Sequence, residues 1–495
     1  MTTSAWERLG AQDASFVMFE HRTTPMHVGA IAICDAGPLT TADGGIDAER
    51  IAKHVESRLH RLPRYRMKLA WTRLERHPVW VDDADFDLTY HLRRTALPRP
   101  GSEAVLRELV GRVLSQHLDR GKPLWEMWIV EGLEGGRFAL ISKVHHCMVD
   151  GVAGANLLTS LFSARPDEPP EPMLPWTPRA VPGGMAQLAA EGARRGRLVG
   201  ELAGALGAAL RDPRAAALRI AATGAAVAQA LAAAVRLPAP TGLNCPIGPH
   251  RRFEWLSLDL AEVRAVKERL GGTVNDVVLA VVSGALHRFL GERGEWLARL
   301  DYRIVLPVNM RPAGDTTAAS NRVSAMFLSL PVAEPDALRR YARIRAETAR
   351  LKGSRAAEGI DLLTRLTDRI GSTGMTLFGV RLATRLHPYN LIVTNVPGPQ
   401  FPLYVLGATL LELYPQVPLF ERQGLGVAVL SYCGKVGFGL VGDRDVVPDL
   451  ARLREAMAES FAELASASAG GVARAGRRRS SRKRAASSAR PAGPH

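Results

Sequence analysis

Between residues 120 and 162, apolar and polar positions follow a pattern that predicts two strands, a short loop and a helix. Trp125–Val130 and Phe138–Val144 are rich in apolar and aromatic residues, and the turn between them, Gly132–Gly136, contains glycine at three positions. This arrangement is typical of a β-hairpin. Val152–Phe162 then places apolar residues at helical spacing. Residues 145–151 therefore form a loop held by regular structure on both sides, where catalytic groups are commonly placed.

The rest of the chain alternates strand and helix patterns on both sides of a long connector, which predicts an α/β fold. In the first part, Ala30–Cys34 is a predicted strand, and Ile46–Arg61 and Ser102–His117 are predicted helices. The second part contains strands at Tyr302–Pro307 and Leu391–Asn395, a helix at Asp336–Leu351, and a hairpin formed by Leu425–Cys433 and Lys435–Gly442.

The connector changes composition along its length. Arg165–Pro182 is dense in proline and is predicted to be extended. Met185–Arg236 is rich in alanine, a strong helix former, and is predicted to be helical. Leucine recurs there at every fourth position, at Leu198, Leu202, Leu206 and Leu210. We interpret this stripe as a bridging helix packed on the two halves, in preference to a membrane-inserted helix.

Length and composition indicate two domains. A chain of 495 residues exceeds what one hydrophobic core usually supports, and a hydrophobic content of 46% is enough for compact units. The predicted division is an N-terminal subdomain at 1–165, a proline- and alanine-rich, largely helical connector at 166–240, a C-terminal subdomain at 241–467 and a disordered basic tail at 468–495.

The net charge of +15 is concentrated near the C-terminus, which weakens the case for a nucleic-acid-binding protein. Gly471–His495 has no acidic residue and contains more than half of that net charge, at Arg474, Arg477, Arg478, Arg479, Arg482, Lys483, Arg484 and Arg490. Such a segment is too poor in apolar residues to fold alone. It can hold anionic lipid headgroups, bind nucleic acid non-specifically, or remain solvated. We favour a lipid surface and expect no specific nucleic-acid partner.

Cysteine usage and hydropathy indicate the compartment. Four widely spaced cysteines form no disulfide framework, so we expect the reducing cytoplasm. Charged residues interrupt the first stretch before any apolar core forms, so no signal peptide is predicted. The longest uncharged run, Ile220–Val235, is mostly alanine and shorter than the roughly 20 apolar residues that span a bilayer. The expected location is cytoplasmic, in peripheral contact with the inner face of the membrane or with lipid inclusions.

The loop at 145–151 contains the pattern HHxxxDG, from His145 and His146 to Asp150 and Gly151. An imidazole with a pKa near 6.5 can take a proton from a hydroxyl and return it to a leaving thiolate, which contributes about 10²–10⁴-fold in rate. Neighbouring residues on a strand point to opposite faces. We therefore expect His146 to be the general base and His145 to be packed inward.

The other members of the motif have alternative interpretations. Asp150 can be a second base, although we favour an ion pair with an arginine that holds the loop. Gly151 most simply allows a positive φ or a close backbone approach. Neither HExxH nor CxxC partners are present to complete a zinc site, so no metal is expected. Nothing nearby marks Cys147 as an activated thiolate, and we interpret it as packing.

The motif and several further segments resemble the bacterial wax ester synthase/acyl-CoA:diacylglycerol acyltransferase family. The motif alone is shared with a wider group that includes chloramphenicol acetyltransferase and the condensation domains of peptide synthetases. The narrower resemblance extends from about residue 5 to 465 and rests on Asp13–Phe16, Pro25–Gly29, Leu118–Arg120, Pro123–Trp125, Leu243–Arg252, Asn275–Asp276, Pro307–Pro312 and Asn395–Pro399. Cys245 departs from it, since a small residue such as glycine is expected there.

The resemblance implies an acyltransferase that uses fatty acyl-CoA as cosubstrate, with no other cofactor, and His146 as its base. The implied acceptor is diacylglycerol or a long-chain alcohol. The implied fold has two chloramphenicol-acetyltransferase-like subdomains, each a mixed β-sheet with flanking helices, which form a pseudo-dimer with a tunnel at their interface. Asn275 and Asp276 are functional positions in the family. Asn275 either donates to the oxyanion of the tetrahedral intermediate or caps the helix Asp276–Leu290.

By the same resemblance, the aspartate of the motif pairs with an arginine, and the candidates are Arg64, Arg66 and Arg311. The segment Pro123, Leu124 and Trp125 lies one hairpin away from the histidines. It either contacts substrate or packs in the core at the start of a strand, and the sequence leaves both alternatives open.

Two other functions fit the same residues. One is a related acyltransferase or condensation enzyme with a carrier-protein donor, or with a polyketide or amine acceptor. The other is a lipid-surface binding protein that has lost turnover. Its sign in the sequence would be a damaged HHxxxDG motif, and the motif here is intact.

Overall fold

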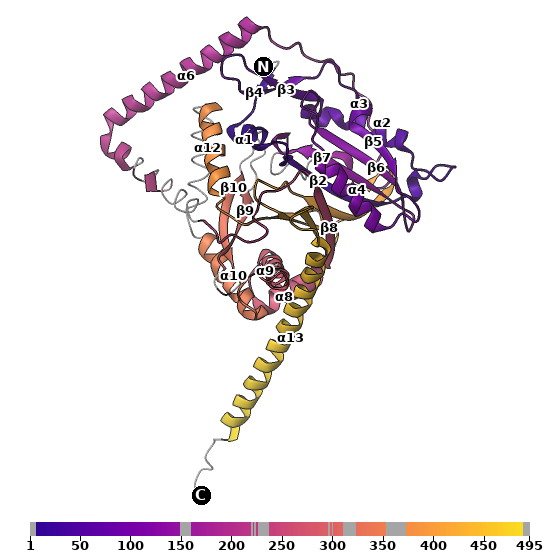
Figure 1. Cartoon of the computed structure of the whole chain (residues 1–495), viewed down its shortest axis with the longest axis vertical. Coiled ribbons are helices and arrows are strands. Elements are labelled where there is room, and N and C mark those ends of the chain that lie inside the picture. The colour runs from indigo at the N-terminus through magenta and orange to yellow at the C-terminus, as the bar shows by residue number, and fades with distance from the viewer. Residues whose placement is uncertain are drawn as a thin grey trace.

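Two six-stranded sheets with flanking helices form the body of the protein (Figure 1). The computed structural model describes residues 6–148, 160–218, 221, 224–225, 237–295, 298, 300–309, 323–352 and 373–488. A small three-stranded sheet of β1 (Trp6–Arg8), β4 (Pro78–Asp82) and β3 (Met67–Trp71) lies at the N-terminal end. The mixed α/β class expected from the sequence is confirmed.

The first large sheet carries the segment with the two histidines. Its strands are β12 (Tyr404–Val405), β13 (Ala408–Gln416), β2 (His27–Asp35), β7 (Arg137–His145), β6 (Trp125–Leu133) and β5 (Leu92–Ala96), in that order. Helix α2 (Ala48–Arg58) packs through Ile51 on one face, and α4 (Glu103–Ser115) packs through Val110 on the other. Both faces of β2 and β7 are therefore buried, as their nearly continuous apolar sequence predicts.

The second large sheet contains most of the later strands. Its order is β10 (Val323–Leu330), β9 (Tyr302–Asn309), β11 (Leu391–Pro397), β14 (Leu425–Tyr432), β15 (Lys435–Asp443) and β8 (Arg251–Asp259). The predicted β14–β15 hairpin is confirmed. Its two turn residues, Cys433 and Gly434, have φ of 43° and 79°, the left-handed pair that a tight hairpin turn requires.

Helix α9 (Val274–Glu292) is the central helix of the second half. It is apolar around most of its circumference and packs against the sheet, α10 (Ala337–Lys352) and α13 (Leu450–Ser488). Among the described residues, it is the helix whose length and composition would allow a membrane crossing, and 72% of that window is buried inside the protein. Its burial is that of a core helix.

The two halves exchange chain. β13 comes from the later part of the sequence, yet it pairs with β2 and extends the first sheet, with β12 at the edge. The predicted C-terminal subdomain at 241–467 is therefore not a separate unit. The physical reason is that β13 satisfies the backbone hydrogen bonds of β2, which would otherwise be an exposed edge.

The halves also meet where α4 packs against β8. The guanidinium of Arg107 lies 4.3 Å from the ring centroid of Trp255, and its Nε lies 3.3 Å from Glu254. A Cβ at Gly111 would lie 2.8 Å from the carbonyl oxygen of Arg251. Glycine at this position allows the helix to approach the strand closely.

The remaining helices are short or peripheral. They are α1 (Ala11–Phe19), α3 (Leu88–His91), α8 (Leu260–Leu270) and α12 (Thr373–Leu386), with 3₁₀ turns at Gly37–Leu39, Leu59–Arg61, Pro63–Arg66 and His146–Met148. The predicted strands and helices of both halves are present, with ends shifted by a few residues. The helix predicted at Val152–Phe162 lies largely outside the described residues.

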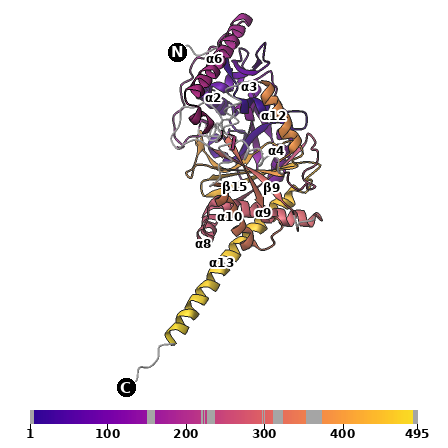
Figure 2. The ribbon, with the colours of Figure 1, turned by 90° about the vertical axis from the view of Figure 1, so that its left-hand side faces the viewer.

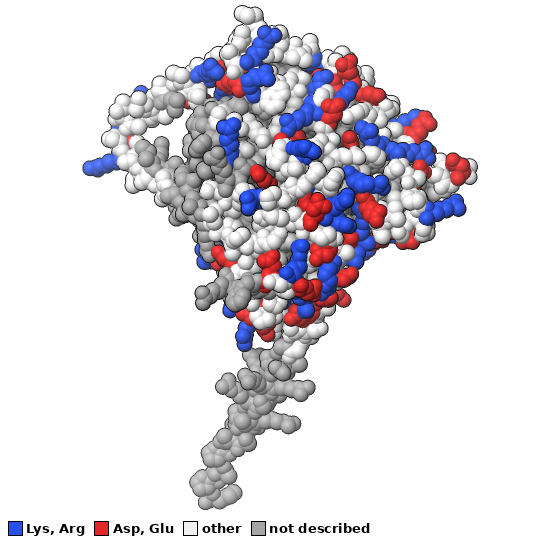
Figure 3. All heavy atoms as spheres, in the orientation of Figure 1, with Lys and Arg blue, Asp and Glu red and all other residues white. Residues whose placement is uncertain are grey.

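Helix α6 (Gly184–Arg211) corrects the prediction of a packed bridging helix. It arches away from the body in Figure 1, and Figure 3 shows that its outer surface carries few charged side chains. Val199, Leu206 and Leu210 are 66%, 63% and 75% exposed. In its first half, Arg194 and Arg195 pair with Glu75. Abundant alanine is enough to form the helix, and Leu206 and Leu210 of the leucine stripe are exposed.

The C-terminal segment corrects a second prediction. Helix α13 runs without a break from Leu450 to Ser488, so most of the tail predicted to be disordered is helical. Both ribbon views show it projecting far from the body (Figures 1 and 2). Alanine and arginine are good helix formers, and the tail continues a helix already formed in the core, so the cost of nucleation is not repeated.

Candidate active site

The two motif histidines lie where β7 ends and a 3₁₀ turn, His146–Met148, begins. Both backbone amides are fixed by neighbouring segments. The N–H of His145 donates to the carbonyl of Leu124 at 2.9 Å, and that of His146 donates to the carbonyl of Met26 at 2.7 Å. The loop therefore begins from a rigid position between β2 and β6.

His145 is packed inward, with 1% of its surface exposed. Its Nδ1 accepts the backbone N–H of Cys147 at 3.1 Å, and the Cys147 thiol lies 2.9 Å from the same atom. Burial raises the pKa of this thiol, which keeps it protonated. Cys147 is therefore a buried packing and donor group, and no thiolate nucleophile forms there at neutral pH.

His146 has a different neighbour. Its ring stacks on Phe16 of α1, with ring centroids 3.7 Å apart and an angle of 15° between the planes. Burial lowers the pKa of His146 to about 4, and the neighbouring His145 contributes in the same direction. The imidazole is therefore neutral at physiological pH, the form that can accept a proton.

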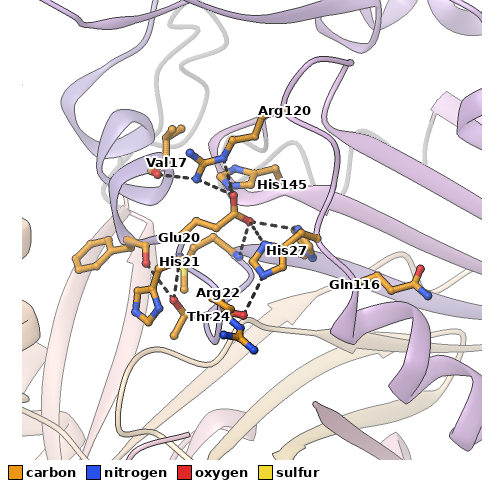
Figure 4. A network of polar contacts seen from close by, with 12 residues as sticks. Val17, Glu20, His21, Arg22, Thr24, His27, Gln116, Arg120 and His145 are labelled. Carbon is orange, nitrogen blue, oxygen red and sulfur yellow. Dashed lines mark hydrogen bonds and ion pairs between the residues drawn. The ribbon is translucent and has the colours of Figure 1, made fainter. Parts of the chain in front are cut away.

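Beneath the loop, a buried carboxylate gathers several basic side chains (Figure 4). Glu20 follows directly after α1 and is 4% exposed at its side chain. Its oxygens lie 3.4 Å from His27 and His117, 3.6 Å from His145, and 2.8 Å from Arg120. Burial opposes the ionisation of Glu20, but its contacts with His145 and His27 outweigh this and lower its pKa.

His27 belongs to the same network and faces His145 across β2 and β7. Burial lowers the pKa of His27 to about 3, although Glu20 acts in the opposite direction. Arg120 brings a full positive charge to Glu20, since its Nε and Nη2 donate to one oxygen at 2.9 and 2.8 Å. A charge-assisted pair of this kind is roughly twice as strong as a neutral hydrogen bond.

Asp150, Gly151 and Arg311 lie outside the described residues, so the predicted ion pair of Asp150 stays a prediction. The other two arginine candidates have partners of their own. Arg64 donates to Glu7 at 2.6 Å. The Arg66 guanidinium lies over the rings of Phe86 and Trp176, 5.9 and 5.1 Å from their centroids.

The segment Pro123–Trp125 is buried close to the histidine loop. Leu124 and Trp125 belong to the same core cluster as Cys147 and Met148. The Trp125 indole donates to the carbonyl of Tyr65 at 2.8 Å and stacks on His91 at 4.6 Å. These contacts are those of a core position, while a contact with substrate stays a prediction.

Asn275 and Asp276 lie at the start of α9, and the cap of this helix differs from the predicted one. Thr273 is the N-cap, and it forms a capping box with Asp276. The Asp276 carboxylate accepts from Thr273 and, at 2.7 Å, from the Thr348 hydroxyl, which ties α9 to α10. A carboxylate used in this way supports the helix start and cannot donate to an oxyanion.

Asn275 is instead held by a residue from another predicted segment. The Asn395 amide on β11 donates to the side-chain oxygen of Asn275 at 3.2 Å. This bond connects two segments that are far apart in the sequence, and it turns the oxygen of Asn275 toward Asn395 and its amide nitrogen away. A role for Asn275 as an oxyanion donor stays a prediction.

Sequence reasoning missed five side chains of this site: Phe16, Glu20, His27, His117 and Arg120. Phe16 and His27 lie in segments already noted for their family resemblance, as does Arg120. Glu20 carries no local signal, because its partners lie up to 125 residues away (His145) and only the fold brings them together.

In the described part of the chain, the histidine loop coincides neither with a metal-binding cluster nor with the cavity lined by Arg66, Phe86 and Trp176. Among the residues that the structure describes, no group of three or more His, Cys, Asp or Glu side chains is arranged to hold a metal ion. A cavity of about 990 Å³ lies between α2, β5 and the connector, with Arg66, Phe86 and Trp176 in its wall. Neither His145 nor His146 is among the residues that line this cavity.

Solved structures share this architecture. A wax ester synthase/diacylglycerol acyltransferase from Marinobacter aquaeolei VT8 aligns with a TM-score of 0.66 and 28% identity, over 93% of this chain and 100% of that chain. The starter condensation domain of rhizomide synthetase aligns over 93% of this chain and 95% of that chain, with a TM-score of 0.57 and 13% identity, which shows the fold alone. The protein is thus an acyltransferase with the chloramphenicol-acetyltransferase-like fold.

Sequence comparison defines the family. The wax ester synthase/diacylglycerol acyltransferase catalytic domain matches residues 9–278, and the C-terminal domain of the same family matches residues 319–465. The chain therefore belongs to the wax ester synthase/diacylglycerol acyltransferase family, and it is an acyl-CoA-dependent acyltransferase.

Two mycobacterial relatives are similar over nearly the whole chain. A putative diacylglycerol O-acyltransferase of Mycobacterium tuberculosis strain CDC 1551 is 38% identical over 474 residues, covering 93% of this chain and 90% of the relative. A probable diacylglycerol O-acyltransferase of strain H37Rv is 33% identical over 457 residues, covering 91% and 94%.

Proposed function

We propose that the protein transfers a fatty acyl group from acyl-CoA to the hydroxyl of diacylglycerol, and also to long-chain alcohols, with His146 as the general base. The observation that carries this proposal is the difference between the surroundings of the two motif histidines. His145 accepts the backbone N–H of Cys147 and its Nε2 lies 3.6 Å from Glu20, while His146 presents a neutral imidazole stacked on Phe16. The names of the mycobacterial relatives support the acceptor class.

In this proposal, the His146 imidazole takes the proton of the acceptor hydroxyl as its oxygen attacks the thioester carbonyl. The new C–O bond gives a tetrahedral intermediate, whose collapse breaks the C–S bond. The leaving CoA thiolate takes the proton back from the imidazolium, so the enzyme returns to its starting state. No covalent acyl-enzyme and no cofactor beyond acyl-CoA take part.

The Asn275 amide, oriented by Asn395, is the proposed donor to the oxyanion of this intermediate. Removing one such donor in other enzymes costs about 3–4 kcal/mol. Asn275 occupies the second position of α9, where the positive end of the helix dipole also favours a developing negative charge.

We further propose that the enzyme works at a lipid surface, on the cytoplasmic side. The exposed stripe of Val199, Leu206 and Leu210 on α6 supports this, because apolar side chains on the outside of a helix are stabilised at a lipid interface. Arg197 and Arg211 lie on the opposite face of the helix by its periodicity. The basic sequence of the last turns of α13 adds attraction for anionic headgroups, about 1 kcal/mol per residue near the surface.

A substrate assay tests the proposed acceptor. Purified protein is mixed with palmitoyl-CoA and either diolein or hexadecanol, and free thiol release and product chromatography are followed together. The proposal predicts thiol release that depends on the acceptor and an equal amount of ester product. Thiol release with no ester would contradict it, and an amide product from an amine acceptor would favour the condensation-type alternative.

A further inference from the structure

The carboxylate of Glu20 is connected to the histidine loop by three separate routes. The first passes through its Oε2 atom, which lies 3.6 Å from Nε2 of His145. This separation is longer than a standard hydrogen bond, and His145 Nε2 has no hydrogen-bond partner. Such contacts are often long in ligand-free enzymes and shorten when substrate binds.

On this first route, the position of the proton on the His145 ring determines which of its nitrogen atoms can donate. The backbone N–H of Cys147 points at Nδ1, so Nδ1 must present its lone pair. A neutral His145 therefore carries its proton on Nε2, the atom that faces the acceptor oxygen of Glu20. Glu20 and Cys147 thus hold the two sides of the ring in one tautomer, as a second partner does for metal-bound histidines.

The second route passes through Oε1. This oxygen accepts the backbone N–H of Met26 at 3.3 Å, and the carbonyl of the same residue accepts the backbone N–H of His146 at 2.7 Å. Glu20 is therefore two hydrogen bonds away from the backbone of His146. Figure 4 shows the carboxylate between the segment that contains Thr24 and the side chains of Arg120 and His145.

The third route is the helix itself. Glu20 caps the C-terminal end of α1, and its backbone N–H donates to the carbonyl of Phe16 at 3.2 Å. Phe16 is the residue whose ring stacks on His146. Arg120 joins this end of α1 to the rest of the site, since it donates both to Glu20 and to the carbonyl of Val17.

We propose that Glu20 is a positioning residue for His146: it fixes the tautomer of His145, the backbone of the histidine loop and the end of the helix that carries Phe16. This inference rests on the proposed role of His146 as the base. Glu20 itself touches no reacting atom. A base must be held within a small distance of its target, and a shift of about 1 Å can cost about 10²-fold in rate.

The carboxylate is required because donors approach it from both sides. Arg120 and His145 face Oε2, while the backbone N–H of Met26 donates to Oε1. A glutamine in this place has the same shape but only one acceptor oxygen. Its NH₂ group would face donors on one side in either orientation.

The test combines a tautomer measurement with kinetics. The ¹⁵N signals of the histidine rings are recorded in the wild-type protein, and those of His145 are assigned by their loss in a His145→Asn variant. The inference predicts a proton on Nε2 of His145. This measurement needs no activity, so the predicted tautomer can be checked even if a Glu20 variant does not fold. A wild-type protein with the proton on Nδ1 would overturn the inference.

The kinetic part uses Glu20→Gln and Glu20→Asp, with Glu334→Gln as a matched control. Glu334 is also a buried carboxylate that forms an ion pair with an arginine (Arg343, 2.9 Å) and accepts from a backbone amide, but it lies in the second half before α10. Glu20→Gln should lower kcat about 10-fold or more and leave the KM for acyl-CoA within about two-fold. Glu20→Asp, which keeps two acceptor oxygens, should retain more activity than Glu20→Gln, and Glu334→Gln should keep kcat.

Wild-type kcat in Glu20→Gln, or an equal loss in Glu334→Gln, would overturn the inference. Failure of the underlying base assignment is distinguishable. In that case His146→Ala would keep activity, while the tautomer of His145 would still be the one predicted here.

Discussion

The imidazole of His146 lies nearly flat on the phenyl ring of Phe16, with 3.7 Å between the ring centroids. One face of the catalytic candidate is thereby covered by α1, a helix that also contacts α12 of the second half. The stack restricts the rotation of the ring and removes water from one of its faces. Both effects suit a base that must be neutral and held in one direction.

Replacing Phe16 should therefore lower kcat by more than a loss of folding stability would explain. Phe16→Leu fills most of the volume but offers no flat face, so kcat should fall about 10-fold, and Phe16→Ala should lose more. The measurement is kcat with palmitoyl-CoA and a saturating acceptor. Phe19→Leu is the control, since Phe19 lies on the same helix and contacts Phe420 instead. Equal losses in both variants would show that the stack has no particular role.

The pH dependence of the rate should report the lowered pKa of His146. A general base works in its neutral form, so kcat/KM is lost as the pH falls through its pKa. Burial places that pKa at about 4. kcat/KM should therefore stay level between about pH 8 and pH 5.5, whereas an ordinary imidazole would lose half of it near pH 6.5. Circular dichroism at each pH checks that the protein remains folded. A midpoint between pH 6 and pH 7 would contradict the assigned environment.

The exposed stripe of α6 should mediate binding to lipid. Burial of a leucine side chain is worth about 1.5–3 kcal/mol, so Leu206→Asp with Leu210→Asp should weaken flotation with phosphatidylcholine/phosphatidylglycerol vesicles about 10-fold or more. Activity toward a water-soluble short-chain alcohol should be unchanged, because Leu206 and Leu210 are exposed and do not belong to the core cluster that packs Cys147 and Met148.

The matched control places the same two charges on the opposite face, as Gly204→Asp with Ala208→Asp. Both of these positions are exposed, and nothing lies within 4 Å of a Cβ at Gly204. This variant should bind vesicles as the wild type does. An equal loss of binding in the two variants would show that added charge matters and the apolar stripe does not.

The local sequence pattern predicted the strands that carry the histidines, because a β-hairpin is formed by residues that are close together in the sequence. The strands β6 and β7, their glycine-containing turn and the placement of His145 at a strand end all follow from alternation and composition over about 20 residues. The hairpin of β14 and β15 was predictable for the same reason, since its turn lies at Cys433 and Gly434.

Long-range pairing was not predictable in this way. Nothing in Ala408–Gln416 shows that this strand will pair with β2, because both sheets accept apolar strands of the same length. Glu20 looks like an ordinary surface residue until the fold surrounds it with Arg120 and His145. The exposure of Leu206 and Leu210 was missed because an apolar stripe on a helix predicts burial. The sequence does not show which surface the stripe would be buried against.

The central claim is that His146 removes the proton of the acceptor hydroxyl. Its most direct test is kcat for acyl transfer from palmitoyl-CoA in His146→Ala, with His287→Ala as a control for loss of a partly buried histidine. The account predicts a fall of about 10²–10⁴-fold in His146→Ala, with an unchanged circular dichroism spectrum, and near wild-type activity in His287→Ala. A His146→Ala protein that keeps more than about a tenth of the wild-type kcat would contradict it.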